Sequence, residues 1–446
     1  MNSTGLQWNI LRTLRIGLFN FGSAMADILV ASVWNRVLIT DLGASATPVA
    51  LLLGLRYLLA PISIWTGVQS DTRPIFGLRR APYIWLGRVP MLIGILLLPL
   101  STTRLAVNVN DAAGWGLALA IFVLYGLGTA VSGGPFLALV HDSAPAARRG
   151  LAISLAQIIL IVGFAVSPIV FARWLPAYSA AGFESLSVAT AVVAGIIWLV
   201  SILGQDHRVA PVAVAAPRQA NTLQTLRTMW ADARTRRFFF FLALGALASF
   251  AQDAILEPFG GDVFGLSVQD TTRFSATFGV GVLLAMLVTS AVTRRNRPEE
   301  QTRPASVGLG VMIVGLILLA ASGLGLVRWL ITPALIVFGL GFGVYTVGGV
   351  SLLMAMTADS RAGAYLGLWT MTQLVSRGAG IGLGGLLRDL GLALTGSPAL
   401  AYAGVFILEA VGLGVCIWLV ARLDTVGFAR EHQSSTPPSS LAALAD

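Results

Sequence analysis

Long unbroken runs of apolar residues restrict how this chain can fold more than any other feature. A helix needs about 20 mostly apolar residues to cross a bilayer. The hydrocarbon offers no water to the backbone, so a spanning segment must be a helix or part of a closed barrel. The runs are continuous instead of alternating, which excludes the barrel. We therefore predict an all-α membrane protein with twelve transmembrane helices, near residues 14–38, 48–69, 82–101, 113–140, 150–172, 183–203, 237–257, 273–293, 305–325, 329–356, 362–387 and 398–421.

The charged residues support this class of protein and indicate its orientation. Of 446 residues 56% are hydrophobic and 11% charged, against about 25% charged in soluble domains. With the N-terminus inside, 20 Arg fall in cytoplasmic segments and five in external ones. This bias predicts cytoplasmic N- and C-termini, and the basic face would favour anionic lipids of the bilayer. The net charge of +9 therefore indicates membrane orientation, and we expect no nucleic-acid partner.

The order of the spans predicts two similar halves. We expect an N-terminal six-helix bundle at 1–203, a cytoplasmic linker at 204–236, a C-terminal six-helix bundle at 237–423 and a disordered cytoplasmic tail at 424–446. Leu223, Leu226 and Trp230 fall at helical spacing in the linker, as in an interfacial amphipathic helix, although a simple tether is an equal reading. A shift of 217 residues brings Asp142 of the first half onto Asp359 of the second, and a shift of 226 brings Asp27 onto Asp253. Two bundles related by an axis along the membrane normal resemble the major facilitator fold.

Charged residues inside the spans are candidate functional residues because they are costly in a membrane. Those assigned to a central cleft are Asp27, Arg56, Asp253, Glu257 and Arg377. In the facilitator plan the helices that carry Asp27 and Asp253 line that cleft, so we expect these residues to face each other. They would couple protons or polarise a ligand, or they would join helices. Arg36 also lies in a span.

Three of the charged residues inside the spans are expected near the ends of their helices. Arg88 and Glu409 would reach toward the interface. Glu257 would lie at the external rim, where Pro258 and the Gly260–Gly261 pair end the seventh helix.

An arginine-rich loop with the sequence GVQSDTRPIFGLRRAPYIW occupies residues 67–85. It resembles the loop between helices 2 and 3 of the major facilitator superfamily, with the motif residues Gly67, Asp71, Arg73, Gly77, Arg79 and Arg80. The spacing departs from the general pattern and is similar to that of the bacteriochlorophyll-delivery family of PucC- and LhaA-like light-harvesting assembly proteins. Two further segments, 34–52 and 250–272 with QDAILEPFGGDVF, are similar to the same family.

This resemblance implies a role in photosynthesis. It implies location in the cytoplasmic or intracytoplasmic membrane of a photosynthetic bacterium, with antenna polypeptides and bacteriochlorophyll as partners. The leading hypothesis is a non-enzymatic assembly factor that holds bacteriochlorophyll or delivers it to antenna polypeptides. A proton-coupled carrier of a small solute is the alternative, and a scaffold that touches neither is a third.

No catalytic or metal-binding pattern is expected. The chain has a single cysteine, Cys416, and three histidines without metal-ligand spacing. Bacteriochlorophyll is therefore the one cofactor considered, as cargo or ligand. Only His141 lies close enough to a span to ligate its magnesium, and a solvated or capping residue at an interfacial turn is the simpler reading.

Overall fold

The computed structural model describes residues 9–145, 148–206, 233–293, 302–355 and 362–422. Within these ranges the chain is almost entirely helical and contains no strand longer than an isolated bridge. Eleven of the described segments are long and apolar enough to cross a membrane, and α14 adds a further helix of 34 residues. The prediction of an all-α membrane protein is confirmed.

The helices form two consecutive groups, which we call the N-terminal and C-terminal groups. The N-terminal group comprises α1 Ile10–Ile28, η1 Leu29–Trp34, η2 Val37–Asp41, α2 Ala46–Leu58, α3 Pro61–Thr72, α4 Ala81–Val107, α5 Ala112–Asp142, α6 Arg149–Trp174 and α7 Ala180–Ile202. The C-terminal group comprises α9 Ala233–Phe250, η4 Ala251–Ala254, α10 Leu256–Phe264, α11 Val268–Thr293, α12 Thr302–Gly325, η6 Arg328–Leu330, α13 Ile331–Ala355, α14 Ala362–Thr395 and α15 Pro398–Ala421.

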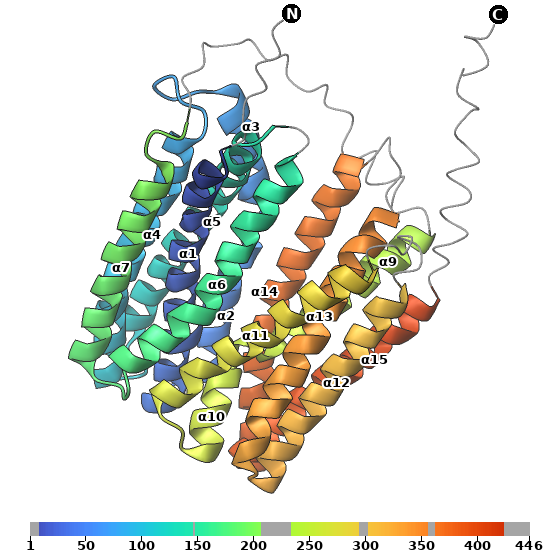
Figure 1. Ribbon diagram of the computed structural model, residues 1–446. Helices are drawn as coiled ribbons and strands as arrows, with labels where there is room; N and C mark the ends of the chain where they lie inside the picture. The colour runs from blue at the N-terminus through green and yellow to red at the C-terminus, as the bar shows by residue number, and fades with distance from the viewer. Residues whose placement is uncertain (1–8, 146–147, 207–232, 294–301, 356–361, 423–446) are drawn as a thin grey trace, which may run out of the picture.

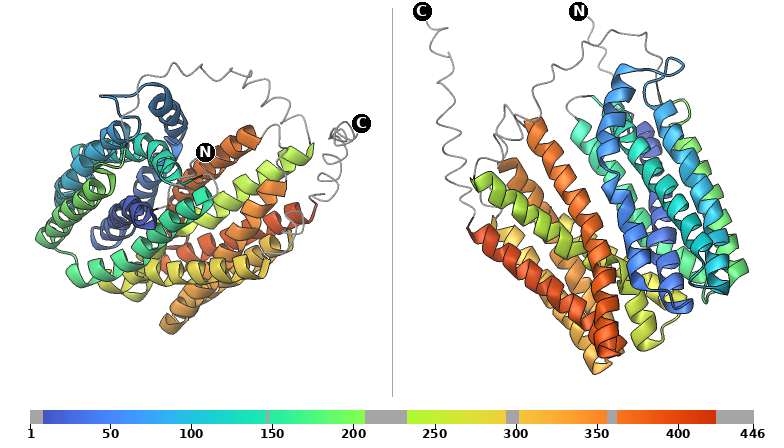
Figure 2. Two further views of the ribbon diagram at one scale, coloured as in Figure 1. Left: turned by 45° about the horizontal axis from the view of Figure 1, so that its top comes forward. Right: turned by 180° about the vertical axis from the view of Figure 1, so that it is seen from behind.

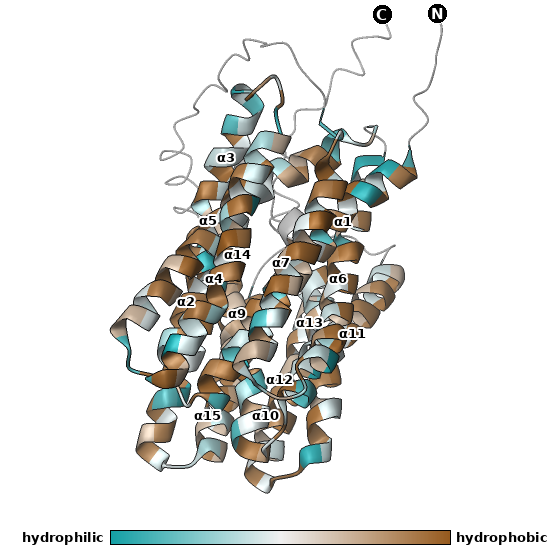
Figure 3. Cartoon of the chain, turned by 90° about the vertical axis from the view of Figure 1, so that its left-hand side faces the viewer, coloured by the Kyte–Doolittle hydropathy of each residue, from teal (hydrophilic) through white to brown (hydrophobic). Residues whose placement is uncertain are grey.

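The two groups lie side by side, blue to green and yellow to red in Figures 1 and 2. They meet where α2 packs on α14 and α6 packs on α11. Figure 3 shows apolar residues along the long helices, with polar residues gathered toward the two ends. We call the end that carries residues 73–80 the turn end, and the opposite end, where α10 lies, the α10 end.

The seventh predicted helix is broken, and it ends later than predicted. The chain passes from α9 through a 3-10 turn at Ala251–Ala254 into α10. Pro258 does not end the helix because it is the third residue of α10, where the backbone N–H has no intrahelical acceptor to lose. The helix ends instead at Gly265, whose φ of 64° favours glycine.

The second predicted helix is also two helices. α2 ends at Leu58, and α3 begins with Pro61 as its first residue. A proline lacks the N–H that a continuous helix would need, so a boundary at this position is favoured. Together α2 and α3 still form one candidate membrane span, Ala46–Thr72, as predicted for 48–69.

Glycines on α14 allow three helices to approach closely. A Cβ on Gly378 would lie 2.7 Å from the Gly54 carbonyl oxygen of α2, and a Cβ on Gly384 would lie against the Ala251 carbonyl of η4. Gly385 meets the first turn of α2 in the same way. These contacts pack α14 tightly against α2 and η4.

Several predictions fall partly outside the described residues. Residues 207–232 of the predicted linker and 423–446 of the predicted tail are not described, and neither is Asp359, one of the residues matched by the repeat. The domain boundaries remain predictions.

Candidate functional site

Two of the ion pairs that join helices contain the aspartates expected in the cleft, and the first of these connects α1 with α2. Asp27 Oδ1 accepts hydrogen bonds from Arg56 Nη1 at 2.7 Å and from the Tyr125 hydroxyl at 2.6 Å. The Arg56 side chain is 7% exposed and that of Asp27 is 30% exposed. A guanidinium buried to this degree needs a nearby anion, and Asp27 supplies it.

The second ion pair lies in the C-terminal group. Arg377 Nη2 of α14 donates to Asp253 Oδ2 at 3.0 Å, and the Gln252 amide donates to Asp253 Oδ1 at 3.3 Å. The Arg377 guanidinium also stacks 4.0 Å from the centroid of the Phe250 ring. Asp253 lies in the 3-10 turn between α9 and α10, so the break in this helix positions the carboxylate.

Tyr57 of α2 connects the two ion pairs. The Arg56 guanidinium lies 4.7 Å from its ring centroid and the Arg377 guanidinium lies 4.6 Å from it. Arg56 also donates to the Tyr57 hydroxyl at 2.8 Å. The structure thus brings Asp27 and Asp253 into one network across the two groups, which we call the ion-pair network, with each carboxylate paired to an arginine.

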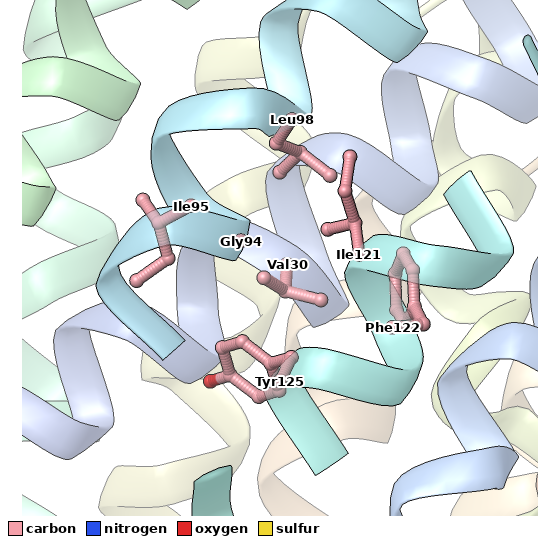
Figure 4. A pocket seen from close by; sticks show the side chains of 7 residues that line it. All are labelled: Val30, Gly94, Ile95, Leu98, Ile121, Phe122 and Tyr125. Carbon is pink, nitrogen blue, oxygen red and sulfur yellow. The ribbon is translucent and has the colours of Figure 1, made fainter. Parts of the chain in front are cut away.

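The surroundings of Tyr125 are apolar. Figure 4 shows its ring beside Val30, Ile95, Leu98, Ile121 and Phe122 around a small pocket. This space is too small to hold a water molecule. The hydroxyl therefore depends on Asp27 for its hydrogen bond.

Glu257 does not lie at an external rim, as the sequence analysis expected. It is 3% exposed, and its Oε1 accepts hydrogen bonds from Ser32 at 2.9 Å and from Ser275 at 2.7 Å. Glu257 thereby joins α10 to η1 and α11, apart from the ion-pair network. Glu257 was expected at the rim because Pro258 was predicted to end the seventh helix, whereas α10 continues to Phe264.

Arg88 and Glu409 do not reach an interface. Arg88 is 4% exposed, and its guanidinium lies 4.2 Å from the ring centroid of Phe19 and 4.5 Å from that of Trp198. Cation–π contacts of this kind stabilise a charge away from water. Glu409 is also 4% exposed, and neither carboxylate oxygen has a hydrogen-bond partner in the described part of the chain.

A polar contact that the sequence analysis missed joins the two groups at the α10 end. Asp389 of α14 accepts hydrogen bonds from the backbone N–H groups of Ala46 at 3.0 Å and Thr47 at 2.7 Å. The carboxylate thus caps α2 from the other group. No local pattern could reveal this cap, because its partners lie more than 340 residues away.

A second cross-group contact at the α10 end uses a residue noted from the sequence. Arg36 donates to the Leu266 carbonyl at 2.8 Å and to Asp41 at 2.8 Å. A buried guanidinium in this position holds the end of the first span against the loop after α10.

The motif residues of the arginine-rich loop occupy two different structures. Gly67 and Asp71 lie on α3, which continues to Thr72, so the connection itself is only residues 73–80. At its tip Ile75 and Leu78 exchange backbone hydrogen bonds of 3.0 Å around Phe76 and Gly77. Both tip residues have positive φ, as in the tight turns of hairpins.

Arg80 is the centre of the polar contacts at this end. It is 8% exposed and pairs with Asp71 at 2.6 Å and with Asp142 of α5 at 3.2 Å. Its Nη1 also donates to Ser70 at 2.8 Å. The exposed Arg73 contributes its carbonyl, which accepts from the Tyr83 hydroxyl at 2.8 Å. Arg79 has an intermediate exposure, and its Nε finds no partner in the described residues.

His141 lies apart from the ion-pair network and borders the Arg80 contacts through Asp142. Its side chain is 44% exposed, and Nδ1 lies 3.3 Å from Asp142 Oδ1. Among the described residues no group of three or more His, Cys, Asp or Glu side chains is arranged to hold a metal ion. Pigment ligation by His141 remains a prediction.

Solved transporter structures share this fold. A nucleoside transporter, NupG, superposes with a TM-score of 0.68 at 15% identity, covering 92% of this chain and 98% of that one. A bacterial homologue of the human lysosomal transporter Spinster, inward-facing and unoccupied, superposes with a TM-score of 0.67 at 17% identity, covering 96% of this chain and 98% of that one. The architecture is the major facilitator fold, and this likeness concerns the fold alone.

Sequence comparisons identify the family. A protein of Rhodobacter capsulatus, described as uncharacterized and encoded in the puhA-bchM intergenic region, is 30% identical over 90% of this chain and 86% of its own. Protein PucC of Rhodovulum sulfidophilum is 29% identical over 85% of each chain. The bacteriochlorophyll synthase 44.5 kDa chain of R. capsulatus is 28% identical over 97% of this chain and 98% of its own. Residues 33–428 match the family described as PUCC protein, and the chain therefore belongs to that family.

Proposed function

We propose that this multi-pass membrane protein is an assembly factor for photosynthetic light-harvesting complexes. It would hold bacteriochlorophyll or deliver it to antenna polypeptides as they enter the bilayer. The observation that carries the proposal is the family match over residues 33–428, with relatives named for PucC and for bacteriochlorophyll synthesis. A membrane protein suits this role because the free pigment is apolar and aggregates in water.

The location is part of the same proposal. We place the protein in the cytoplasmic or intracytoplasmic membrane with both termini in the cytoplasm, and the arginine distribution supports this orientation. The partners would be antenna polypeptides, bacteriochlorophyll and the bilayer lipids.

We further propose that the protein is not an enzyme, although one relative is named as a synthase chain. The family and the transporter-like fold support this assignment. The purified protein should convert no bacteriochlorophyll precursor under conditions in which authentic pigment binds.

The main test is purification from a bacterium that makes bacteriochlorophyll, followed by near-infrared absorption of the protein. We expect a pigment band in a fixed ratio to protein. A gene deletion should lower the amount of assembled antenna. Colourless protein, together with normal antenna in the deletion strain, would refute the proposal.

A proton-coupled carrier is the second candidate because transporters share the fold and because α9 and α10 are joined by a break that carries Asp253. Broken helices with buried charges form ion and substrate sites in transporters. In this case the variants Asp27→Asn and Asp253→Asn would both abolish pH-gradient-driven uptake into vesicles. Under the assembly proposal the two aspartates hold helices together, and each variant would differ from the wild type only in having a lower stability.

A further inference from the structure

A groove of about 800 Å³ opens at the turn end, separate from the ion-pair network. Its walls are the tip of the 73–80 turn, the first turns of α4 up to Pro90, and residues 202–206 at the end of α7. Sites for organic ligands usually enclose roughly 300–1,000 Å³. The groove is therefore large enough for a ligand wider than a single acyl chain.

The walls are held in place by contacts that do not require a ligand. Asp206 Oδ2 accepts the backbone N–H groups of Arg80 at 2.7 Å and Ala81 at 2.9 Å, which caps α4. Two arginines of α1 fix the chain that leaves α7. Arg12 donates to the Gln205 carbonyl at 2.8 Å, and Arg15 donates to the Leu203 carbonyl at 2.8 Å. The groove is thus preformed.

The turn that closes one side of the groove is strained. Phe76 has a φ of 53°, which is unfavourable for a bulky residue, and its side chain is 92% exposed. Packing within the described residues does not explain why an aromatic side chain is held there. Strain of this kind persists where a binding site uses it.

The lining determines the chemistry of a ligand. Apolar and aromatic side chains dominate it, including Trp85 of the family-like segment. Leu86 and Val89 are 62% and 48% exposed on a membrane-spanning helix, so the groove opens toward lipid. An apolar ligand can therefore enter from the bilayer.

Among the described residues that line the groove one side chain is charged, the carboxylate of Asp206. Both hydrogen bonds of Asp206 end on Oδ2, and Oδ1 accepts none from the described part of the chain. Carboxylate oxygen is a preferred ligand of magnesium. An electropositive magnesium at the centre of an apolar macrocycle complements this arrangement.

We propose that this groove binds a magnesium tetrapyrrole that enters from the lipid, with the macrocycle against Trp85 and Asp206 Oδ1 ligating the metal. The assignment rests on the proposed function, and it adds the position of the pigment and the residue that recognises it. His141 has no part in this site, since it does not line the groove.

The test titrates the full-length purified protein with bacteriochlorophyll and with the same pigment after removal of magnesium, following binding by near-infrared absorption. Leu86→Trp fills the groove, and Leu96→Trp on the same helix is the matched control because Leu96 is 47% exposed outside it. Asp206→Asn keeps an oxygen that can cap α4. Its control is Asp111→Asn, since Asp111 also caps a helix, α5, and does not line the groove.

We expect Leu86→Trp to weaken binding of both pigments about tenfold or more, whereas Leu96→Trp binds as the wild type does. Asp206→Asn should weaken binding of the magnesium pigment by at least roughly tenfold, as loss of a metal contact does, and leave the metal-free pigment unaffected. Folding of each variant is checked by size-exclusion chromatography, and the asparagine variant tests the site even where the tryptophan variant fails to fold.

The outcomes separate the two proposals. Wild-type protein that binds neither pigment refutes the pigment function and the groove with it. If the wild-type protein binds pigment and both Leu86→Trp and Asp206→Asn bind it equally well, the assignment of pigment to the groove is overturned, while the pigment function stands. Loss of co-purified lipid in Leu86→Trp, with pigment binding intact, would identify a lipid site and also overturn the assignment.

Discussion

The two ion pairs of the network are predicted to differ in their contribution to stability, although each pairs one aspartate with one arginine. Removing one partner of a buried pair costs about 3–5 kcal/mol because it leaves an uncompensated charge. Arg56 is 7% exposed, but Asp27 is 30% exposed, so partial hydration reduces the loss. We expect Asp27→Asn to lower the free energy of unfolding by about 2–3 kcal/mol, allowing for this hydration.

The second pair is more open. The side chains of Arg377 and Asp253 are 32% and 29% exposed, and Arg377 keeps its contacts with two aromatic rings when the carboxylate is lost. Pairs accessible to water contribute about 0–1 kcal/mol. We therefore expect Asp253→Asn to lower stability by less than about 1 kcal/mol.

The assay is denaturant unfolding of each purified variant in the same detergent, followed by intrinsic fluorescence. A double variant provides the internal check, because Arg56→Met combined with Asp27→Asn removes the orphaned charge and should recover part of the lost stability. An Asp253→Asn variant as unstable as Asp27→Asn, or a double variant that loses the sum of both single changes, would refute this reasoning.

Three further substitutions test the packing between the groups and the turn. Gly384→Ala should cost about 2 kcal/mol or more, since overpacking against backbone cannot relax, whereas Gly414→Ala has open space around it and should be neutral in the same unfolding assay. Asp389→Ala should lower stability by about 1 kcal/mol through loss of the α2 cap. Asp389→Asn should keep most of the stability that the cap contributes, and equal losses in the two variants would contradict a capping role. Arg80→Ala breaks contacts with α3 and α5 and should expose the 73–80 turn to limited proteolysis, while Arg73→Ala should leave the cleavage rate unchanged.

The sequence predicted the helical spans and the buried charges because both follow from the cost of placing polar groups in hydrocarbon. It could not predict their partners, which come from distant segments. Arg88, for example, contacts the rings of Phe19 and Trp198, and each ring belongs to a different helix. The break after Phe250 was missed for another reason, since no proline or glycine marks residues 251–254.

Some of the missed features had a local signal. Pro61 marked the boundary between α2 and α3, and the position of Pro258 near a helix start was readable once the preceding break was known. The cap that Asp389 provides had no local signal in the sequence. The candidate site was therefore predictable as a set of charged residues, but its pairing and the connection through Tyr57 were not.

The cross-group contacts of Asp389 and Arg36 have a mechanical consequence, because both lie at the α10 end. If they act as a pivot, the two groups behave as lever arms. α14 has 34 residues and so is about 50 Å long. Asp389 lies 27 residues, about 40 Å, from the far end of this helix at Ala362. A rotation of roughly 10° about that pivot would therefore displace the far end by about 7 Å. A small change near α2 would thereby be amplified into a large separation at the turn end.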